Sequence, residues 1–118
     1  MDEISQATQS VVRAFNQAMN KHDLDAVMSL MTQDCIFENT QAVPDGTRYE
    51  GAIAVRAFWE EFLRETPNAR FDEEELIACG DRSIVLWSYD WGNGHVRGVD
   101  VMRVREGKVC EKFSYVKG

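Results

Sequence analysis

Ile84-Val-Leu-Trp-Ser-Tyr-Asp-Trp91 and Val99-Asp-Val-Met-Arg-Val104 are rich in β-branched and aromatic residues, and Trp87, Tyr89 and Trp91 recur at every second position. Such alternation is typical of half-buried strands. Working outward, the pattern predicts four consecutive strands, and turn signals separate them at Gly80-Asp81, Gly92-Asn93-Gly94 and Glu106-Gly107. We place these strands at residues 69–79, 83–91, 95–105 and 108–116. An antiparallel meander follows.

The first half of the chain has a helical period. Residues 4–19 carry an apolar stripe at steps of three and four: Ile4, Ala7, Val11, Phe15, Ala18 and Met19. Asp23 is a good N-cap for a short second helix. A short strand is expected at residues 34–39 and a turn region at 40–48. A third helix over 52–65 ends before Pro67, with an apolar face of Ile53, Ala57, Phe58 and Phe62 and with Trp59 at its edge.

Helices segregated from a run of strands indicate an α+β fold. We expect one domain over residues 1–118, a strongly bent antiparallel sheet wrapped over three helices, with a cone-shaped pocket between them. The length of 118 residues suffices for a real core and one small-molecule pocket.

Charge and composition exclude several classes of partner. The net charge is −7, which argues against nucleic acid and against an anionic membrane surface. The polar N-terminus MDEISQATQS is unlike a secretory signal, and no apolar run approaches a membrane span. The three cysteines lack metal-site or disulfide spacing and lie among apolar neighbours, so we expect them buried and reduced. A cytoplasmic protein without cofactor or metal is the expectation.

Three stretches resemble the nuclear transport factor 2-like superfamily and, within it, the SnoaL-like branch. They are Lys21-His-Asp-Leu-Asp-Ala-Val-Met-Ser-Leu-Met31 with Asp34-Cys-Ile-Phe-Glu38, then Tyr49-Glu-Gly51, and Arg97-Gly-Val-Asp-Val-Met-Arg103 with Glu106-Gly-Lys-Val-Cys-Glu111 and Tyr115. The resemblance covers essentially the whole chain. It implies the cone-shaped fold strongly and the function weakly, because this fold hosts isomerases, cyclases and non-catalytic binding modules.

Comparison with the ketosteroid isomerases of this superfamily singles out three positions. Where those enzymes place a general-base aspartate this chain has Asn39, and where they place an oxyanion-donating tyrosine it has Phe15. An amide does not abstract a proton from carbon at useful rates, and phenylalanine has no hydroxyl. Their second oxyanion donor, a protonated aspartate, is matched by Asp100. The SnoaL-like polyketide cyclases resemble the chain more, and the acid–base residue that the resemblance implies is again Asp100.

Alternation places Asp100 and Met102 on one face of their strand, and Lys112 on the equivalent face of the next. An isolated Asp100 in an apolar cavity would stay neutral and donate a hydrogen bond, as a general acid does. A buried pair with Lys112 would keep it ionised instead. A solvated Lys112 and a purely structural Asp100 are the alternatives. Catalysis is therefore predicted at Asp100, with Lys112 as a second candidate.

The expected ligand is a small hydrophobic molecule. Trp87, Tyr89 and Trp91 share one strand face, which would line the cavity, belong to the core or cover a dimer interface. The predicted pocket residues are Phe15, Asn39, Phe58, Trp87, Tyr89 and Met102. Asn39 has the alternative role of capping backbone at a strand end. His95 in a turn and His22 before the second helix are expected to be solvated or structural.

Two functions remain open from the sequence. One is a cofactor-free SnoaL-like enzyme with isomerase or cyclase chemistry on a hydrophobic carbonyl compound. The other is a non-catalytic small-molecule-binding or dimerisation module of the same fold. In either case we expect a homodimer through the outer face of the sheet, because its strands are rich in aromatic and β-branched residues.

Overall fold

The computed structural model describes all residues from 1 to 118. Its elements follow the order α1 (Glu3–Asn20), α2 (Leu24–Ser29), β1 (Met31–Glu38), β2 (Arg48–Glu50), α3 (Ala52–Glu65), β3 (Arg70–Cys79), β4 (Arg82–Asp90), β5 (His95–Arg105) and β6 (Lys108–Val116). The three helices and the four-strand meander predicted from the sequence are present, and the boundaries of the meander strands differ by no more than one residue. The α+β fold is confirmed.

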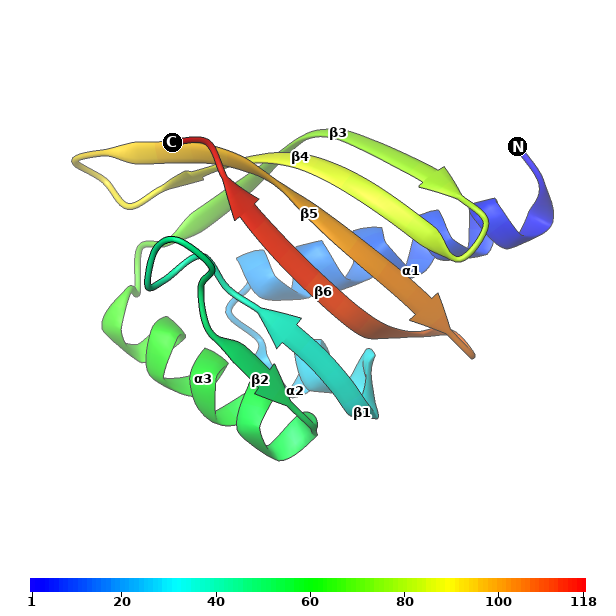
Figure 1. The fold of residues 1–118 in the computed structure, drawn as a ribbon, viewed down its shortest axis with the longest axis horizontal. Coiled ribbons are helices and arrows are strands. Elements are labelled where there is room, and N and C mark those ends of the chain that lie inside the picture. Colours follow the sequence, from blue (N-terminus) through cyan, green and yellow to red (C-terminus); the bar gives the residue numbers. More distant parts are fainter.

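All six strands form one curled sheet in the order β2-β1-β6-β5-β4-β3 (Figure 1). The strand pairs are antiparallel except for β1 and β6, which run parallel, so the expectation of a purely antiparallel sheet was wrong at this pair. Strand β2 was missed as well. It has only three residues, and two of them, Arg48 and Glu50, are charged, so no apolar pattern in the sequence indicates a strand. In the structure Arg48 forms a salt bridge to Glu38 of β1 at 2.8 Å.

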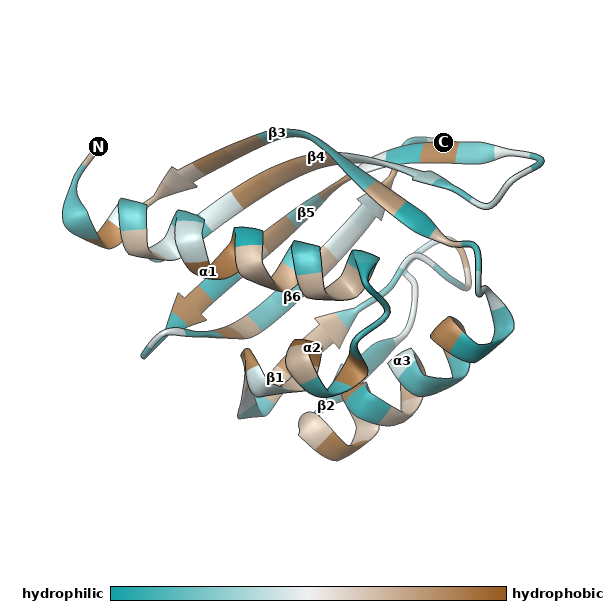
Figure 2. Cartoon of the chain, turned by 180° about the vertical axis from the view of Figure 1, so that it is seen from behind, coloured by the Kyte–Doolittle hydropathy of each residue, from teal (hydrophilic) through white to brown (hydrophobic).

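Helix α1 packs against the concave face of the sheet: it lies behind the strands in Figure 1 and in front of them in Figure 2. Its buried face is Ser5, Thr8, Val12, Phe15, Ala18 and Met19. The predicted stripe was therefore wrong at its start, since Ile4 is 65% exposed. Polar side chains replace apolar ones there because they bond the β3–β4 turn: Thr8 Oγ1 donates to Gly80 O (2.7 Å), and Gly80 N donates to Ser5 Oγ (2.8 Å).

Helices α2 and α3 close the other end of the cone, beside β1 and β2 (Figure 2). Asp23 caps α2 as predicted, its carboxylate accepting from Ala26 N at 3.1 Å. Helix α3 buries Val55 and Trp59, whereas Ile53 is 90% exposed. The predicted apolar face was thus rotated, because the spacings Ile53–Ala57 and Val55–Trp59 are equally helical and only packing against β1 distinguishes them.

The core joins the concave sheet face to α1, α2 and α3, with Phe15 and Phe37 among its fully buried side chains. Removing a ring of this kind costs about 3–5 kcal/mol. Cys35 and Cys110 are buried, but Cys79 is exposed, contrary to expectation, because it ends β3 on the outer face. No helix combines the length and apolar character that crossing a membrane would require.

Candidate functional site

The candidate site is built around an ion pair between adjacent strands. Asp100 on β5 and Lys112 on β6 both point to the concave face, as alternation predicted, and Asp100 Oδ2 lies 3.1 Å from Lys112 Nζ. Their side chains are only 9% and 8% exposed, respectively. The strand register explains the contact. Met102 lies directly opposite Lys112, and Asp100 is the preceding residue of β5 on the same inward face as Met102. Of the alternatives left open by the sequence, the buried pair is the one present.

Each member of the pair has further partners. Asp100 Oδ1 accepts a hydrogen bond from the indole Nε1 of Trp87 on β4 at 2.9 Å. Lys112 Nζ donates to Ser114 Oγ at 3.1 Å and lies over the rings of Phe37 and Trp59, 4.9 and 5.3 Å from their centroids. Cation–π contacts and an opposite charge compensate the desolvation of a buried ammonium. Asp100 is therefore one member of a buried pair and not the isolated carboxyl considered from the sequence.

The larger cavity beside the pair has a volume of about 410 Å³, and the apolar part of its wall is mostly aromatic. It lies between α3, the inward side of β4–β6 and the segment that follows β1. Its apolar wall consists of Phe37, Phe58, Trp59, Phe62, Phe71, Trp87, Tyr89, Trp91, Val96 and Val116. Asp100, Lys112 and Ser114 are polar groups on the same wall. A flat apolar molecule bearing one polar group fits this combination.

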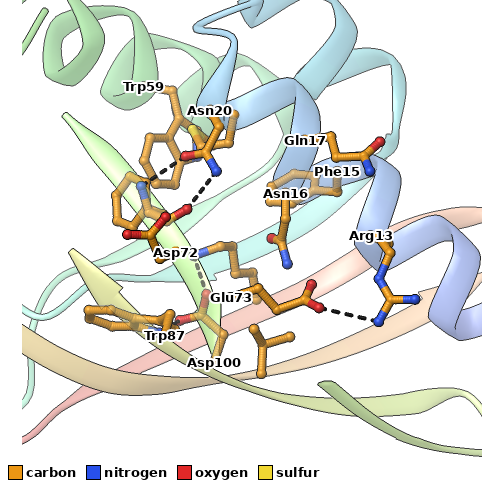
Figure 3. A pocket seen from close by; sticks show the side chains of 14 residues that line it. Arg13, Phe15, Asn16, Gln17, Asn20, Trp59, Asp72, Glu73, Trp87 and Asp100 are labelled. Carbon is orange, nitrogen blue, oxygen red and sulfur yellow. Dashed lines mark hydrogen bonds and ion pairs between the residues drawn. The ribbon is translucent and has the colours of Figure 1, made fainter. Parts of the chain in front are cut away.

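A smaller cavity of about 250 Å³ lies on the other side of the pair, between α1 and β3 (Figure 3). Its rim is polar: Arg13 of α1 pairs with Glu73 of β3 at 3.2 Å, and Asn20 holds the backbone of Phe71 through two hydrogen bonds. Both cavities are bordered by the same five side chains, namely Trp59, Phe71, Trp87, Asp100 and Lys112. The charged pair is therefore accessible from two sides.

The predicted pocket residues differ in their places relative to the two cavities. Phe58 and Tyr89 border the larger cavity, Phe15 the smaller one, and Trp87 both. Met102 is fully buried in the core and borders neither cavity, so its place differs from the one predicted. The stripe of Trp87, Tyr89 and Trp91 runs along the larger cavity, with Trp91 42% exposed at its mouth. Burial raises the pKa of the Tyr89 hydroxyl.

Asn39 has the backbone-capping role considered for it and also lies at the larger cavity. It borders the larger cavity, and its Oδ1 accepts hydrogen bonds from Thr47 N (2.8 Å) and Gln41 N (3.2 Å), which closes the loop between β1 and β2. The histidines lie elsewhere. His95 is exposed at the start of β5, and His22 Nε2 bonds Ala69 O at 2.8 Å.

Sequence reasoning missed two aromatic residues shared by both cavities, Trp59 and Phe71. The signal for Trp59 was the spacing Val55, Trp59, Phe62, which marks a second possible helix face. Phe71 is the first inward aromatic of β3 and stacks on Tyr89 with ring centroids 4.7 Å apart. The chain contains no cluster of three or more histidine, cysteine or acidic side chains arranged to hold a metal ion.

Comparison with known proteins is consistent with this architecture. The structure resembles an NTF2-like protein of unknown function from Mesorhizobium loti, with 38% identity, a TM-score of 0.89 and coverage of 100% of this chain and 97% of the other. No curated protein is significantly similar in sequence.

Two more distant structures share the fold. One, from Kribbella flavida, is proposed to be a ketosteroid isomerase (19% identity, TM-score 0.85, covering 97% of this chain and 80% of the other). Another, from Sinorhizobium meliloti, is proposed to be a polyketide cyclase (17%, 0.78, covering 90% and 94%). The model of the SnoaL-like domain matches residues 12–112. The chain therefore belongs to the SnoaL-like domain family, within the NTF2-like superfamily.

Proposed function

We propose that the protein is a cofactor-free SnoaL-like enzyme that performs isomerase- or cyclase-type acid–base chemistry on a small hydrophobic carbonyl compound. The observation that carries this proposal is the buried Asp100–Lys112 pair, at 3.1 Å, on the wall of an aromatic cavity. A buried charged pair at the edge of a cavity is a frequent feature of reactive sites. The similarity to structures proposed to be a ketosteroid isomerase and a polyketide cyclase supports the reaction class.

The proposed chemistry uses the hydrogen-bond donors and acceptors that Asp100 and Lys112 still have free. Each carboxylate oxygen has two lone pairs, so Asp100 retains acceptor capacity beside Trp87 and Lys112. Asp100 takes a proton from the carbon next to the substrate carbonyl and becomes a neutral carboxyl, while the electron pair moves to the carbonyl oxygen as an enolate. Two of the three Lys112 donors are occupied by Asp100 and Ser114, which leaves one N–H for that oxygen.

The outcome then depends on the substrate. In an isomerisation, Asp100 returns the proton to a different carbon of the same molecule. In a cyclisation, the enolate carbon attacks a second carbonyl, and the proton from Asp100 passes to the new alkoxide. Either route regenerates the Asp100 carboxylate without any added electron carrier.

Deuterium exchange tests the acid–base step without knowledge of the natural substrate. A panel of steroid, aromatic polyketide and terpenoid ketones is first screened for thermal stabilisation, since ligand at about 100 times its Kd adds about 2.7 kcal/mol. Compounds that bind are then incubated with protein in D₂O, and deuterium at the α-carbon is followed by NMR. We expect Asp100→Asn to lower the exchange rate by about 10²–10⁴-fold. Exchange that is equal in wild type and Asp100→Asn would refute the assignment of Asp100 as the base.

A non-catalytic binding module is the second candidate, and two observations favour it. Both oxygens of Asp100 already accept hydrogen bonds or an ion pair within the protein. In addition, Asn39 and Phe15 occupy positions where related enzymes are expected to carry reactive groups. Under this reading, ligands stabilise wild type and Asp100→Asn, and neither protein accelerates deuterium exchange.

We also propose a homodimer through the outer face of the sheet, in the cytoplasm. The support for the dimer is a row of apolar side chains directly opposite one another on four strands, Ile77, Ile84, Val101 and Phe113. Ile77 and Ile84 are 47% and 42% exposed in the single chain.

The proposed location in the cytoplasm rests on the three free cysteines, which are compatible with a reducing compartment.

A further inference from the structure

Ser114 on β6 carries a hydroxyl whose proton has no acceptor within the protein. Its Oγ accepts a hydrogen bond from Lys112 Nζ at 3.1 Å, and an ammonium has no lone pair with which to accept one in return. Ser114 takes part in no other side-chain hydrogen bond. The residue is only partly buried, and it borders the larger cavity. Its O–H is therefore free to donate to a ligand in that cavity.

The strand register places this hydroxyl beside the candidate base. Ser114 lies directly opposite Asp100 of β5, and both residues border the larger cavity. Asp100 Oδ2 lies 3.1 Å from Lys112 Nζ, which in turn bonds Ser114 Oγ. One proton acceptor and two hydrogen-bond donors thus lie side by side on one wall.

The two donors serve different ligand oxygens. Lys112 directs one N–H at Ser114 Oγ, so its remaining free N–H points away from Ser114 at roughly the tetrahedral angle. An oxygen bound to that N–H is out of reach of the Ser114 hydroxyl. The donor atoms are nevertheless only 3.1 Å apart, so the two oxygens that they bind belong on neighbouring carbons of one ligand.

We propose that the ligand is a hydrophobic α-hydroxyketone, whose carbonyl oxygen binds Lys112 and whose hydroxyl oxygen binds Ser114. The inference rests on the proposed acid–base function and names its substrate class. Because Ser114 is paired with Asp100 across the strands, the carbon that bears the hydroxyl is also the carbon whose proton Asp100 takes. A simple ketone lacks the second oxygen and leaves the Ser114 donor unused.

Such a substrate gives the proposed isomerisation a definite course. Asp100 removes the proton from the hydroxyl-bearing carbon, the electron pair of that C–H bond forms a C=C bond, and the carbonyl π electrons move to the oxygen at Lys112. The enediolate then passes its hydroxyl proton to that oxygen. Asp100 returns its proton to the former carbonyl carbon, and the oxygen at Ser114 becomes the new carbonyl. The two groups exchange places, and no oxidant or reductant is needed.

Two probes of nearly the same shape test the proposal on the intact protein. Benzoin and deoxybenzoin share a skeleton of two aromatic rings, which suits the aromatic wall, and differ only in the hydroxyl next to the carbonyl. Isothermal titration calorimetry measures both affinities. Wild type should bind benzoin about tenfold more tightly, although its hydroxyl makes benzoin the better hydrated compound. Equal affinities, tighter binding of deoxybenzoin, or no binding of either probe would overturn the proposal.

Variants assign the preference to one hydroxyl. Ser114→Ala should lower the ratio of the two affinities about tenfold, whereas the loss of an acceptor for Lys112 acts on both probes and cancels in the ratio. Ser114→Thr keeps the hydroxyl and should keep the preference. Thr40→Val removes a hydroxyl elsewhere on the wall of the same cavity, so this matched control should leave the ratio unchanged. A preference that survives in Ser114→Ala would overturn the role of Ser114.

Deuterium exchange separates this inference from the proposed reaction. Deoxybenzoin has exchangeable protons next to its carbonyl, so its exchange in D₂O tests Asp100 without the second oxygen. Exchange that depends on Asp100, with no preference for benzoin, would uphold the proposed reaction and overturn the α-hydroxyketone as substrate. A preference that depends on Ser114, with no Asp100-dependent exchange of either probe, would support the ligand class and refute catalysis.

Discussion

Gly98 on β5 lies directly opposite Trp87 on β4, and the Trp87 ring occupies the space that a side chain at Gly98 would need. A Cβ atom there would lie 2.6 Å from Trp87 Cζ2 and 2.2 Å from the carbonyl oxygen of Tyr115. The absence of a side chain thus allows Trp87 to reach Asp100 at 2.9 Å. One glycine on β5 positions the indole that holds the candidate catalytic carboxylate.

Gly98→Ala should therefore destabilise the fold and disturb the site. We expect a loss of about 1–3 kcal/mol in the free energy of unfolding, the usual cost of overpacking. Chemical denaturation measures this loss, and the indole N–H resonance of Trp87 reports the broken bond to Asp100. Ser88→Ala, one residue from Trp87 on the opposite face of β4, serves as the control. An unchanged Trp87 resonance in Gly98→Ala would contradict the steric argument.

The Asp100–Lys112 pair should show strong coupling in a double-mutant cycle. Lys112→Met leaves a buried carboxylate without its cation, which costs about 3–5 kcal/mol. The double variant Asp100→Asn, Lys112→Met removes both charges and should be more stable than Lys112→Met alone. Urea unfolding of the four proteins measures the cycle. Additive effects would show that the two charges do not interact.

The proposed dimer predicts that a charge at the centre of the outer face separates the subunits. Ile84→Lys places an ammonium within the row that joins Ile77, Val101 and Phe113, so sedimentation at micromolar concentration should show a monomer. Ile53→Lys is the matched control, because Ile53 is 90% exposed on α3, away from this face. A wild-type protein that sediments as a monomer would exclude the dimer at once.

The three thiols should react at very different rates. Burial raises the pKa of both Cys35 and Cys110, which reduces the fraction of reactive thiolate, and Cys79 is exposed at the end of β3. We expect a disulfide reagent such as DTNB to titrate a single thiol rapidly in folded protein and all three in denaturant. Cys79→Ser should abolish the rapid phase. Its persistence in that variant would place a second thiol at the surface.

The salt bridge between Glu74 and Arg97 should give a pH-dependent contribution to stability. Two hydrogen bonds from Arg97, at 3.0 and 2.7 Å, lower the pKa of Glu74 below its ordinary value of 4.5. A lowered folded-state pKa stabilises the fold above pH 4.5, and this contribution disappears as the pH falls through the lowered value.

The difference in Tm between wild type and Glu74→Gln should therefore be present near neutral pH and shrink in acid. Thermal unfolding at several pH values measures it, and added salt should reduce the effect because both side chains are partly exposed. A difference that grows toward acid pH would contradict the sign.

Local patterns carried much of the prediction. Alternation placed Asp100 and Lys112 on the inward face because side-chain direction in a strand has a period of two, and this direction survives as long as the strand pairs without a bulge at those residues. Helix spacing and Pro67 gave the bounds of α3, Ala52–Glu65, since caps and breakers act on their own segment. Motif resemblance gave the family.

Other features arise only when distant segments meet. The parallel contact of β1 with β6, the short strand β2 and the rotation of α3 toward Val55 and Trp59 depend on packing between segments far apart in sequence. The ion pair at the site depends on the register of β5 and β6, which brings Lys112 beside Asp100. Apart from β2, the elements and the inward direction of Asp100 and Lys112 could be predicted from the sequence, because these follow from local geometry. The partners of these side chains required the folded structure, because they depend on the packing of the whole chain.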